Sequence, residues 1–192
     1  MATYSERSSD TDLVTAVTEN QSESTPNKRW LVLAMVVFPV HVWAYVNIFR
    51  EVPAWILRLS IADLLGVIAY TLLFSLLESL LVFALLAVAG WMLKRWVGEK
   101  QVAWATAVSF ITAIWFIILH LNADWIENRA IIPLAIWGIT YLLILTTDIY
   151  LIHTKEKIFQ FIESFAQRLS TLSALYLFID IIGIIYIIIR NV

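Results

Sequence analysis

Five long apolar blocks, separated by short polar stretches, constrain this chain more than any other feature of its sequence. The blocks cover residues 30–49, 61–93, 102–121, 131–152 and 172–189. Each approaches or exceeds the roughly 20 residues that a helix needs to cross about 30 Å of hydrocarbon. Because the blocks are continuously apolar and do not alternate, helices are favoured over the strands of a membrane barrel. The sequence therefore predicts an all-α polytopic membrane protein, a bundle of five transmembrane helices.

The composition is typical of a membrane protein. Hydrophobic residues make up 61% of the sequence, against about 45–50% in soluble domains. The net charge of -2 gives no reason to expect nucleic acid as a partner. The chain has no cysteine, which excludes disulfides, thiolate catalysis and Cys-ligated metal sites.

The first 29 residues differ in kind from the rest. Residues 1–29 are rich in Ser, Thr, Asp and Glu and contain few large apolar side chains. We expect a disordered polar tail, because such a segment buries too little surface to offset its ordering entropy. The tail lacks the apolar core of a signal peptide, so the first block is expected to be an uncleaved anchor.

Positive charges predict the orientation of the chain. Counting Lys and Arg outside the apolar blocks gives nine on the side of the N-terminus and four on the opposite side. The nine are Arg7, Lys28, Arg29, Lys94, Arg95, Lys100, Lys155, Lys157 and Arg168; the four are Arg50, Arg58, Arg129 and Arg190. The positive-inside rule then places the N-terminus in the cytoplasm and the C-terminus outside, and we expect a multi-pass protein of a bacterial inner membrane.

Two connecting segments are predicted to form interfacial helices. Segment 155–169 is amphipathic, and we expect it to lie in the cytoplasmic interface or to dock on the bundle. It serves either as a plain surface helix or as a docking element for a partner. Segment 53–59, with Pro53 in its first turn, is expected to form a short outer helix. Ser60 followed by Asp63 predicts the N-cap of the second membrane helix.

Three ionisable residues lie near the middle of their apolar blocks, namely His41, Glu78 and Asp180. A charged group there costs about 2.5–3.5 kcal/mol or more, so all three are expected to face the bundle interior. Polar residues on the same helical faces are expected to support them: Tyr45, Ser75, Ser79 and Tyr176. Convergence of these faces would form a carboxyl–imidazole–carboxyl cluster and make the first, second and fifth blocks neighbours. The alternative is that each group is satisfied separately by a hydroxyl or a backbone carbonyl.

Signatures of membrane enzymes are missing from the sequence. It contains no H-E-x-x-H zinc motif and no G-x-S-x-G nucleophile, and no cofactor or metal site is expected. Asp63, Asp148 and Asp180 lie at different depths, which argues against a catalytic aspartate pair. A lesser possibility is lipid chemistry at the outer face around His120 and Asp124, for which we find no nucleophile.

A short stretch resembles a known family of envelope proteins. It runs from Phe38-Pro39-Val40 through Tyr45, Asn47 and Val52-Pro53 to Ile56-Leu57-Arg58. It is similar to the start of the membrane domain of bacterial sulfatase-like or lipoteichoic-acid-synthase-like proteins. That family carries its chemistry in a large extracellular domain, so the resemblance implies a stand-alone membrane module and transfers no catalytic residue.

Two functions are compatible with these features. The first is a non-enzymatic accessory or scaffold subunit of a membrane complex, with the lipid bilayer and another membrane protein as partners. The second is a proton-coupled carrier or channel that uses His41, Glu78 and Asp180. The absence of an inverted repeat or of a broken helix pair speaks against the second.

The orientation can be tested by cysteine labelling in intact cells. Cysteines placed at Ser24 and Thr154 should resist a membrane-impermeant thiol reagent, whereas a cysteine at Asn191 should react. Because the native chain has no cysteine, each signal reports one position. Labelling of the first two positions with protection of the third would invert the topology.

Overall fold

The computed structural model describes residues 27–93, 95 and 98–192, and this part of the chain is helical without strands. The long helices are α2 (Lys28–Ile56), α3 (Ile61–Met92), α5 (Gln101–Leu121), α7 (Ile131–Thr154) and α8 (Glu156–Asn191). Two short elements join them, η1 (Gly98–Lys100) and α6 (Asp124–Glu127). All five long helices are long and apolar enough to cross a membrane. The predicted all-α class and the five candidate spans are confirmed.

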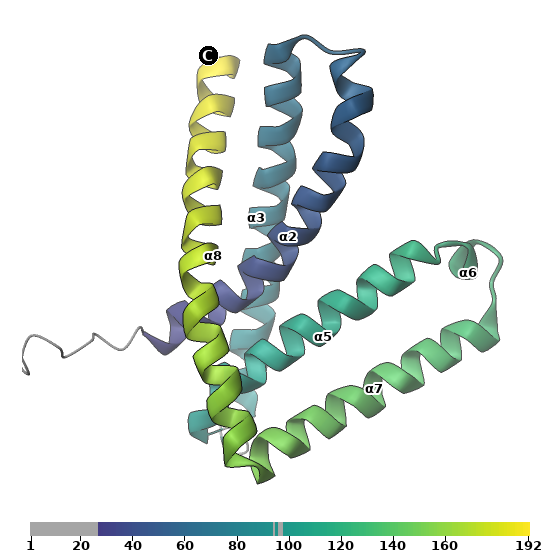
Figure 1. The fold of residues 1–192 in the computed structure, drawn as a ribbon, viewed down its shortest axis with the longest axis vertical. Coiled ribbons are helices and arrows are strands. Elements are labelled where there is room, and N and C mark those ends of the chain that lie inside the picture. The colour runs from purple at the N-terminus through teal and green to yellow at the C-terminus, as the bar shows by residue number, and fades with distance from the viewer. Residues whose placement is uncertain (1–26, 94, 96–97) are drawn as a thin grey trace, which may run out of the picture.

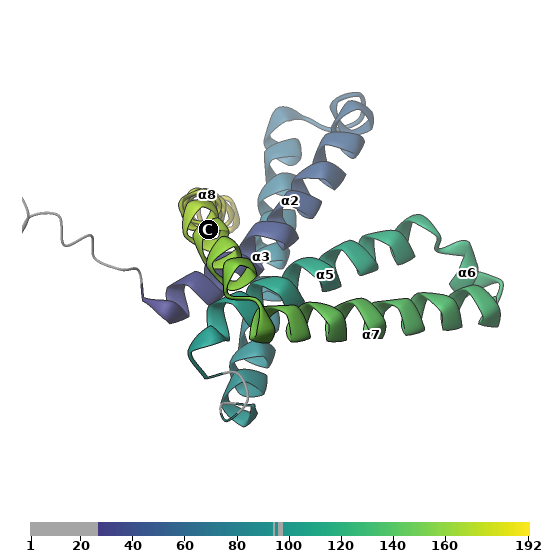
Figure 2. The ribbon, with the colours of Figure 1, turned by 60° about the horizontal axis from the view of Figure 1, so that its bottom comes forward.

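The helices form a three-helix core and a separate hairpin. Figure 1 shows α3 and α8 along the long axis with α2 crossing beside them obliquely, while α5 and α7 diverge from their base as an arm. Figure 2 shows the same divergence from another direction. The expectation of one bundle of five helices therefore holds only for the core, whereas the expected adjacency of the first, second and fifth spans is confirmed.

The path of α5 explains how the arm leaves the core. Its N-terminal half, from Val102 to Ser109, is almost entirely buried, mainly against α2 and α8. Its C-terminal half has one buried residue, Ile111, and lies beside α7. The contact of α5 with α3, the preceding long helix, is slight. Thus only the first half of α5 is closely packed against the core.

Polar contacts between aromatic residues hold the hairpin together. The indole N–H of Trp115 donates to the Trp137 carbonyl at 3.0 Å, and the indole N–H of Trp137 donates to the Trp115 carbonyl at the same distance. One turn away, the hydroxyls of Thr112 and Tyr141 lie 2.9 Å apart. Hydrogen bonds of this kind associate helices in lipid, where apolar contact alone gives little driving force.

Helix α2 is longer at both ends than the sequence predicted. It begins at Lys28, with Asn27 as its N-cap, so the last residues assigned to the polar tail are helical, and residues 1–26 lie outside the described part. At the other end it continues through Pro53 to Ile56, so the separate interfacial helix at 53–59 is wrong. Pro53 removes only one backbone bond near the end of a helix, where the freed carbonyl can meet water.

The predicted interfacial helix at 155–169 is also not a separate element, because α8 runs unbroken from Glu156 to Asn191. No proline occurs in this segment and its first glycine is Gly183, so nothing ends the helix. The chain turns instead at Lys155, between α7 and α8. There Lys100 caps α7 by donating from Nζ to the Ile152 and His153 carbonyls at 3.0 and 3.3 Å. The amphipathic third of α8 docks on α5 and α7, one of the two placements expected for it.

The predicted N-cap of α3 is confirmed. The Ser60 hydroxyl accepts from the Asp63 backbone N–H at 3.2 Å and donates to Asp63 Oδ2 at 2.7 Å. This cap fixes the start of α3 and, as described below, orients the Asp63 carboxyl toward the end of α8.

Candidate functional site

A histidine and an aspartate meet in the middle of the three-helix core. His41 Nε2 of α2 lies 2.9 Å from Asp180 Oδ2 of α8, and both side chains are 0% exposed. The two residues are 139 positions apart in the chain. Two of the three predicted site residues therefore form a buried pair, which is the candidate functional site.

The geometry fixes how many protons the pair holds. His41 Nδ1 lies 2.9 Å from the Val37 carbonyl, and a carbonyl only accepts, so Nδ1 carries a proton. The contact between Nε2 and Oδ2 then needs one further proton, carried by either atom. The pair has zero net charge in both states. A neutral pair is the form that an apolar core tolerates best.

Tyrosines surround this pair. The Tyr176 ring stacks on the His41 ring at 5.7 Å and lies 5.4 Å from the Tyr45 ring. Asp180 Oδ1 and the Tyr45 hydroxyl are buried without a hydrogen-bond partner among the described residues. The predicted supporting roles of Tyr45 and Tyr176 agree with their positions.

The serines of α3 have a different role from the one expected. Ser79 and Ser75 are buried, but each hydroxyl donates to a carbonyl of its own helix, at 2.8 Å to Ser75 and at 3.0 Å to Thr71. They are satisfied locally, which was the alternative interpretation of these polar faces. Ser173 of α8 does connect helices, since its hydroxyl donates to the Ala34 carbonyl at 2.6 Å.

Glu78 does not join the cluster, and the predicted carboxyl–imidazole–carboxyl arrangement is wrong. Its side chain is exposed on the outside of the core, whereas Asp180 is buried. Successive helical residues are rotated by about 100°, so the Glu78 side chain is turned by roughly 60° from Ser75 and about 100° from Ser79, which is enough to leave it exposed while both serines are buried. Because Glu78 is close to Ser75 and Ser79 along the chain, the sequence suggests a shared face, but in the structure they occupy different faces.

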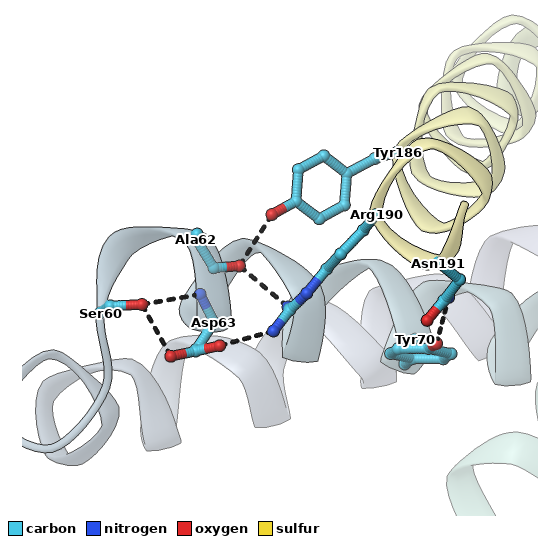
Figure 3. A network of polar contacts seen from close by, with 7 residues as sticks. All are labelled: Ser60, Ala62, Asp63, Tyr70, Tyr186, Arg190 and Asn191. Carbon is cyan, nitrogen blue, oxygen red and sulfur yellow. Dashed lines mark hydrogen bonds and ion pairs between the residues drawn. The ribbon is translucent and has the colours of Figure 1, made fainter.

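A second polar cluster ties the end of α8 to the start of α3. Figure 3 shows Arg190 reaching across α3, with Nη2 bound to Asp63 Oδ1 and Nη1 donating to the Ala62 carbonyl at 3.1 Å. The Tyr186 hydroxyl donates to the same carbonyl at 2.7 Å. The Asn191 amide donates to the Tyr70 hydroxyl at 2.9 Å. We call this cluster the terminal clasp.

A glycine makes room for the terminal clasp. A Cβ atom at Gly66 would lie 1.8 Å from Arg190 Nη1, so the guanidinium occupies the space of the missing side chain. From the sequence alone, Arg190 is expected only as a charge that sets topology and Asp63 only as a helix cap. The signal that was available is that both lie at the same predicted membrane face.

The described residues offer no constellation for metal or nucleophilic chemistry. No group of three or more His, Asp or Glu among residues 27–93, 95 and 98–192 could hold a metal ion. His120 and Asp124 are both exposed, and the His120 ring packs edge-on against Trp43 at 5.4 Å. Comparison with protein-family models, curated proteins and solved structures gave no match. The resemblance of residues 38–58 to sulfatase-like membrane domains therefore stays a prediction.

The buried pair should show strong non-additivity in stability. His41→Leu leaves an unpaired acid in the core and should cost about 3 kcal/mol of unfolding free energy. In the double variant with Asp180→Leu, apolar packing replaces the pair, so most of that loss should be recovered. Unfolding in mixed detergent micelles, followed by circular dichroism, measures both.

Glu78→Leu is the matched control for the pair, because it removes a carboxyl of similar predicted depth from the outside of the core. It should leave the unfolding free energy nearly unchanged and should add independently to either variant of the pair. Simple additivity of His41→Leu and Asp180→Leu would contradict the coupling inferred here.

The terminal clasp predicts an effect for a very small substitution. Gly66→Ala should displace the Arg190 guanidinium and loosen the last turns of α8, so amide hydrogen exchange there should be roughly two- to fivefold faster. Gly138→Ala is the control, since a Cβ at Gly138 meets nothing within 4 Å. Equal exchange rates at the end of α8 in both variants would show that the clasp does not hold it.

Proposed function

We propose that the chain is a non-enzymatic accessory or scaffold subunit of a cell-envelope membrane complex. The observation that carries this proposal is the hairpin arm of α5 and α7. Ile152 is the one buried residue of α7 in the described structure, and the rest of this apolar helix is partly or fully exposed. Such an arm offers a long surface to a neighbouring membrane protein, in addition to the surrounding lipid.

The polar contacts within the arm support the same proposal. The paired tryptophan bonds between Trp115 and Trp137 hold α5 and α7 as one unit, although the core covers little of either helix at that level. A hairpin that is stable without being packed into its own core suits an element that packs into another protein.

The alternative of a proton-coupled carrier is weakened by the position of its residues. It relied on two carboxyls and a histidine at one place, and Glu78 lies on a different face from Asp180. The remaining pair is 0% exposed and holds its proton between two fixed helices. These features suit a pair that fixes α2 against α8, so we do not propose transport.

The proposed location follows from the charges and from the candidate spans. We propose a multi-pass protein of a bacterial inner membrane with a cytoplasmic N-terminus and an outer C-terminus. In that frame the terminal clasp lies at the outer face, and the Lys100 cap lies at the cytoplasmic face.

Isolation in native lipid tests the accessory role. The tagged chain, extracted from its own membranes in polymer-bounded lipid discs, should bring down a membrane protein in fixed stoichiometry. Leu142→Gln on the exposed surface of α7 should reduce this recovery severalfold, because it places a polar group in an apolar contact. Ile182→Gln, at a site on α8 that is 51% exposed against 60% for Leu142, is the matched control and should retain the partner.

Two results would contradict the accessory role. One is a wild-type chain that is recovered alone from native membranes under conditions in which other complexes survive. The other is a lone chain with a measurable catalytic turnover, because an accessory subunit has none of its own.

A further inference from the structure

Glu78 is exposed on the outer surface of α3, far from both ends of that helix. It lies 17 residues after Ile61 and 14 before Met92, which corresponds to about 26 Å and 21 Å along the axis. A glutamate side chain is too short to reach water from such a position. None of the ion pairs in the described part of the chain includes Glu78. The carboxyl is therefore costly where it stands, because hydrocarbon offers it no partner.

The surface around Glu78 is a continuous apolar strip. Exposed Phe74 precedes Glu78 on one face of α3, and exposed Leu81, Leu85 and Val88 follow it, with spacings of four and three residues. Their exposed fractions range from 57% to 69%. Apolar residues repeat at this spacing in helices that pack against a second helix with interlocking side chains. In such pairs a single polar residue in the contact selects the register and the partner. We call these five residues the α3 strip.

We propose that the α3 strip binds a transmembrane helix of another membrane protein that carries a lysine or arginine at the depth of Glu78. The inference rests on the proposed accessory function and names the class of its partner. A basic side chain is the chemical complement of a carboxyl in hydrocarbon, and intramembrane charges are found paired with one another. The apolar side chains of the strip would provide a complementary surface for the partner helix. The ion pair would provide the driving force for association, which apolar contact lacks in lipid.

A second copy of this chain does not provide that complement. None of its Lys or Arg residues lies in the middle of an apolar block. Its one basic residue at a similar depth, His41, is fully buried against Asp180. Symmetric contact of two α3 strips would bring two carboxyls together. The charges thus favour a different protein as the occupant.

The proposal can be tested with a synthetic partner. The full chain is reconstituted in phosphatidylcholine vesicles with a donor dye, together with an acceptor-labelled polyleucine transmembrane peptide that has one central lysine. Energy transfer should show about tenfold tighter binding of this peptide than of the all-leucine peptide. Glu78→Leu should abolish the difference, and Glu78→Gln, which keeps the size and loses the charge, should remove most of it.

A relocated carboxyl controls for charge alone. The variant Glu78→Leu with Ile182→Glu moves the acid to an exposed site on α8. It should not restore binding, because the α3 strip would no longer surround the acid. Full restoration would overturn the proposed face, and equal binding of both peptides to the wild type would overturn the proposed partner. Dominant energy transfer between copies of the chain, lost in Glu78→Leu, would assign the strip to a second copy.

The failure of this inference differs from the failure of the accessory role. A native complex that survives Glu78→Leu leaves the accessory role intact and contradicts the α3 strip as its contact. Selective binding of the lysine peptide, without any native complex, supports the strip and contradicts the accessory role.

Discussion

The contact between His41 and Asp180 is the constraint on which the core of this protein depends. In an apolar surrounding each residue alone would be an unsatisfied polar group, and the penalty of separating them holds α2 against α8. The bond of His41 to the Val37 carbonyl fixes the ring and the position of its proton. The pair acts as a directional lock in a core whose other contacts are mostly apolar and therefore non-directional.

Other polar contacts extend this lock along α8. Toward one end the Ser173 hydroxyl reaches the Ala34 carbonyl of α2, and toward the other end Arg190 and Tyr186 reach the first turn of α3. Between them, Gly183 of α8 lies beside Ala69 of α3, where a Cβ on the glycine would be in ordinary van der Waals contact at 3.7 Å. Because lipid tails are as apolar as the helices, such contacts decide which helices associate. They explain why α8, last in sequence, lies beside α2 and α3.

The hairpin arm follows the same rule with a different outcome. Its polar contacts, the Lys100 cap included, join the start of α5 or α5 itself to α7, and in the described part of the chain no side-chain hydrogen bond joins α5 or α7 to α2, α3 or α8. The arm is therefore internally ordered while most of α7 stays uncovered. The arm and the α3 strip both expose large apolar side chains.

The sequence by itself determined the helical class, the five candidate spans, the Ser60 cap and the adjacency of the first, second and fifth spans. These depend on block length, local hydrogen bonding and the cost of burying an acid, which are readable along one chain. It also identified His41 and Asp180 by their shared depth and shared need for a partner, although the same criteria wrongly included Glu78.

Only the tertiary structure decided that Glu78 faces outward, that α8 is unbroken and that the arm leaves the core. Neighbouring residues of a helix are separated by about 100° of rotation. When polar residues lie on adjoining faces, the sequence of the helix therefore does not show which face will be buried. That choice was made by partners distant in sequence, such as Gly183 against Ala69 and Arg190 over Gly66, which fix how α3 is turned in the core.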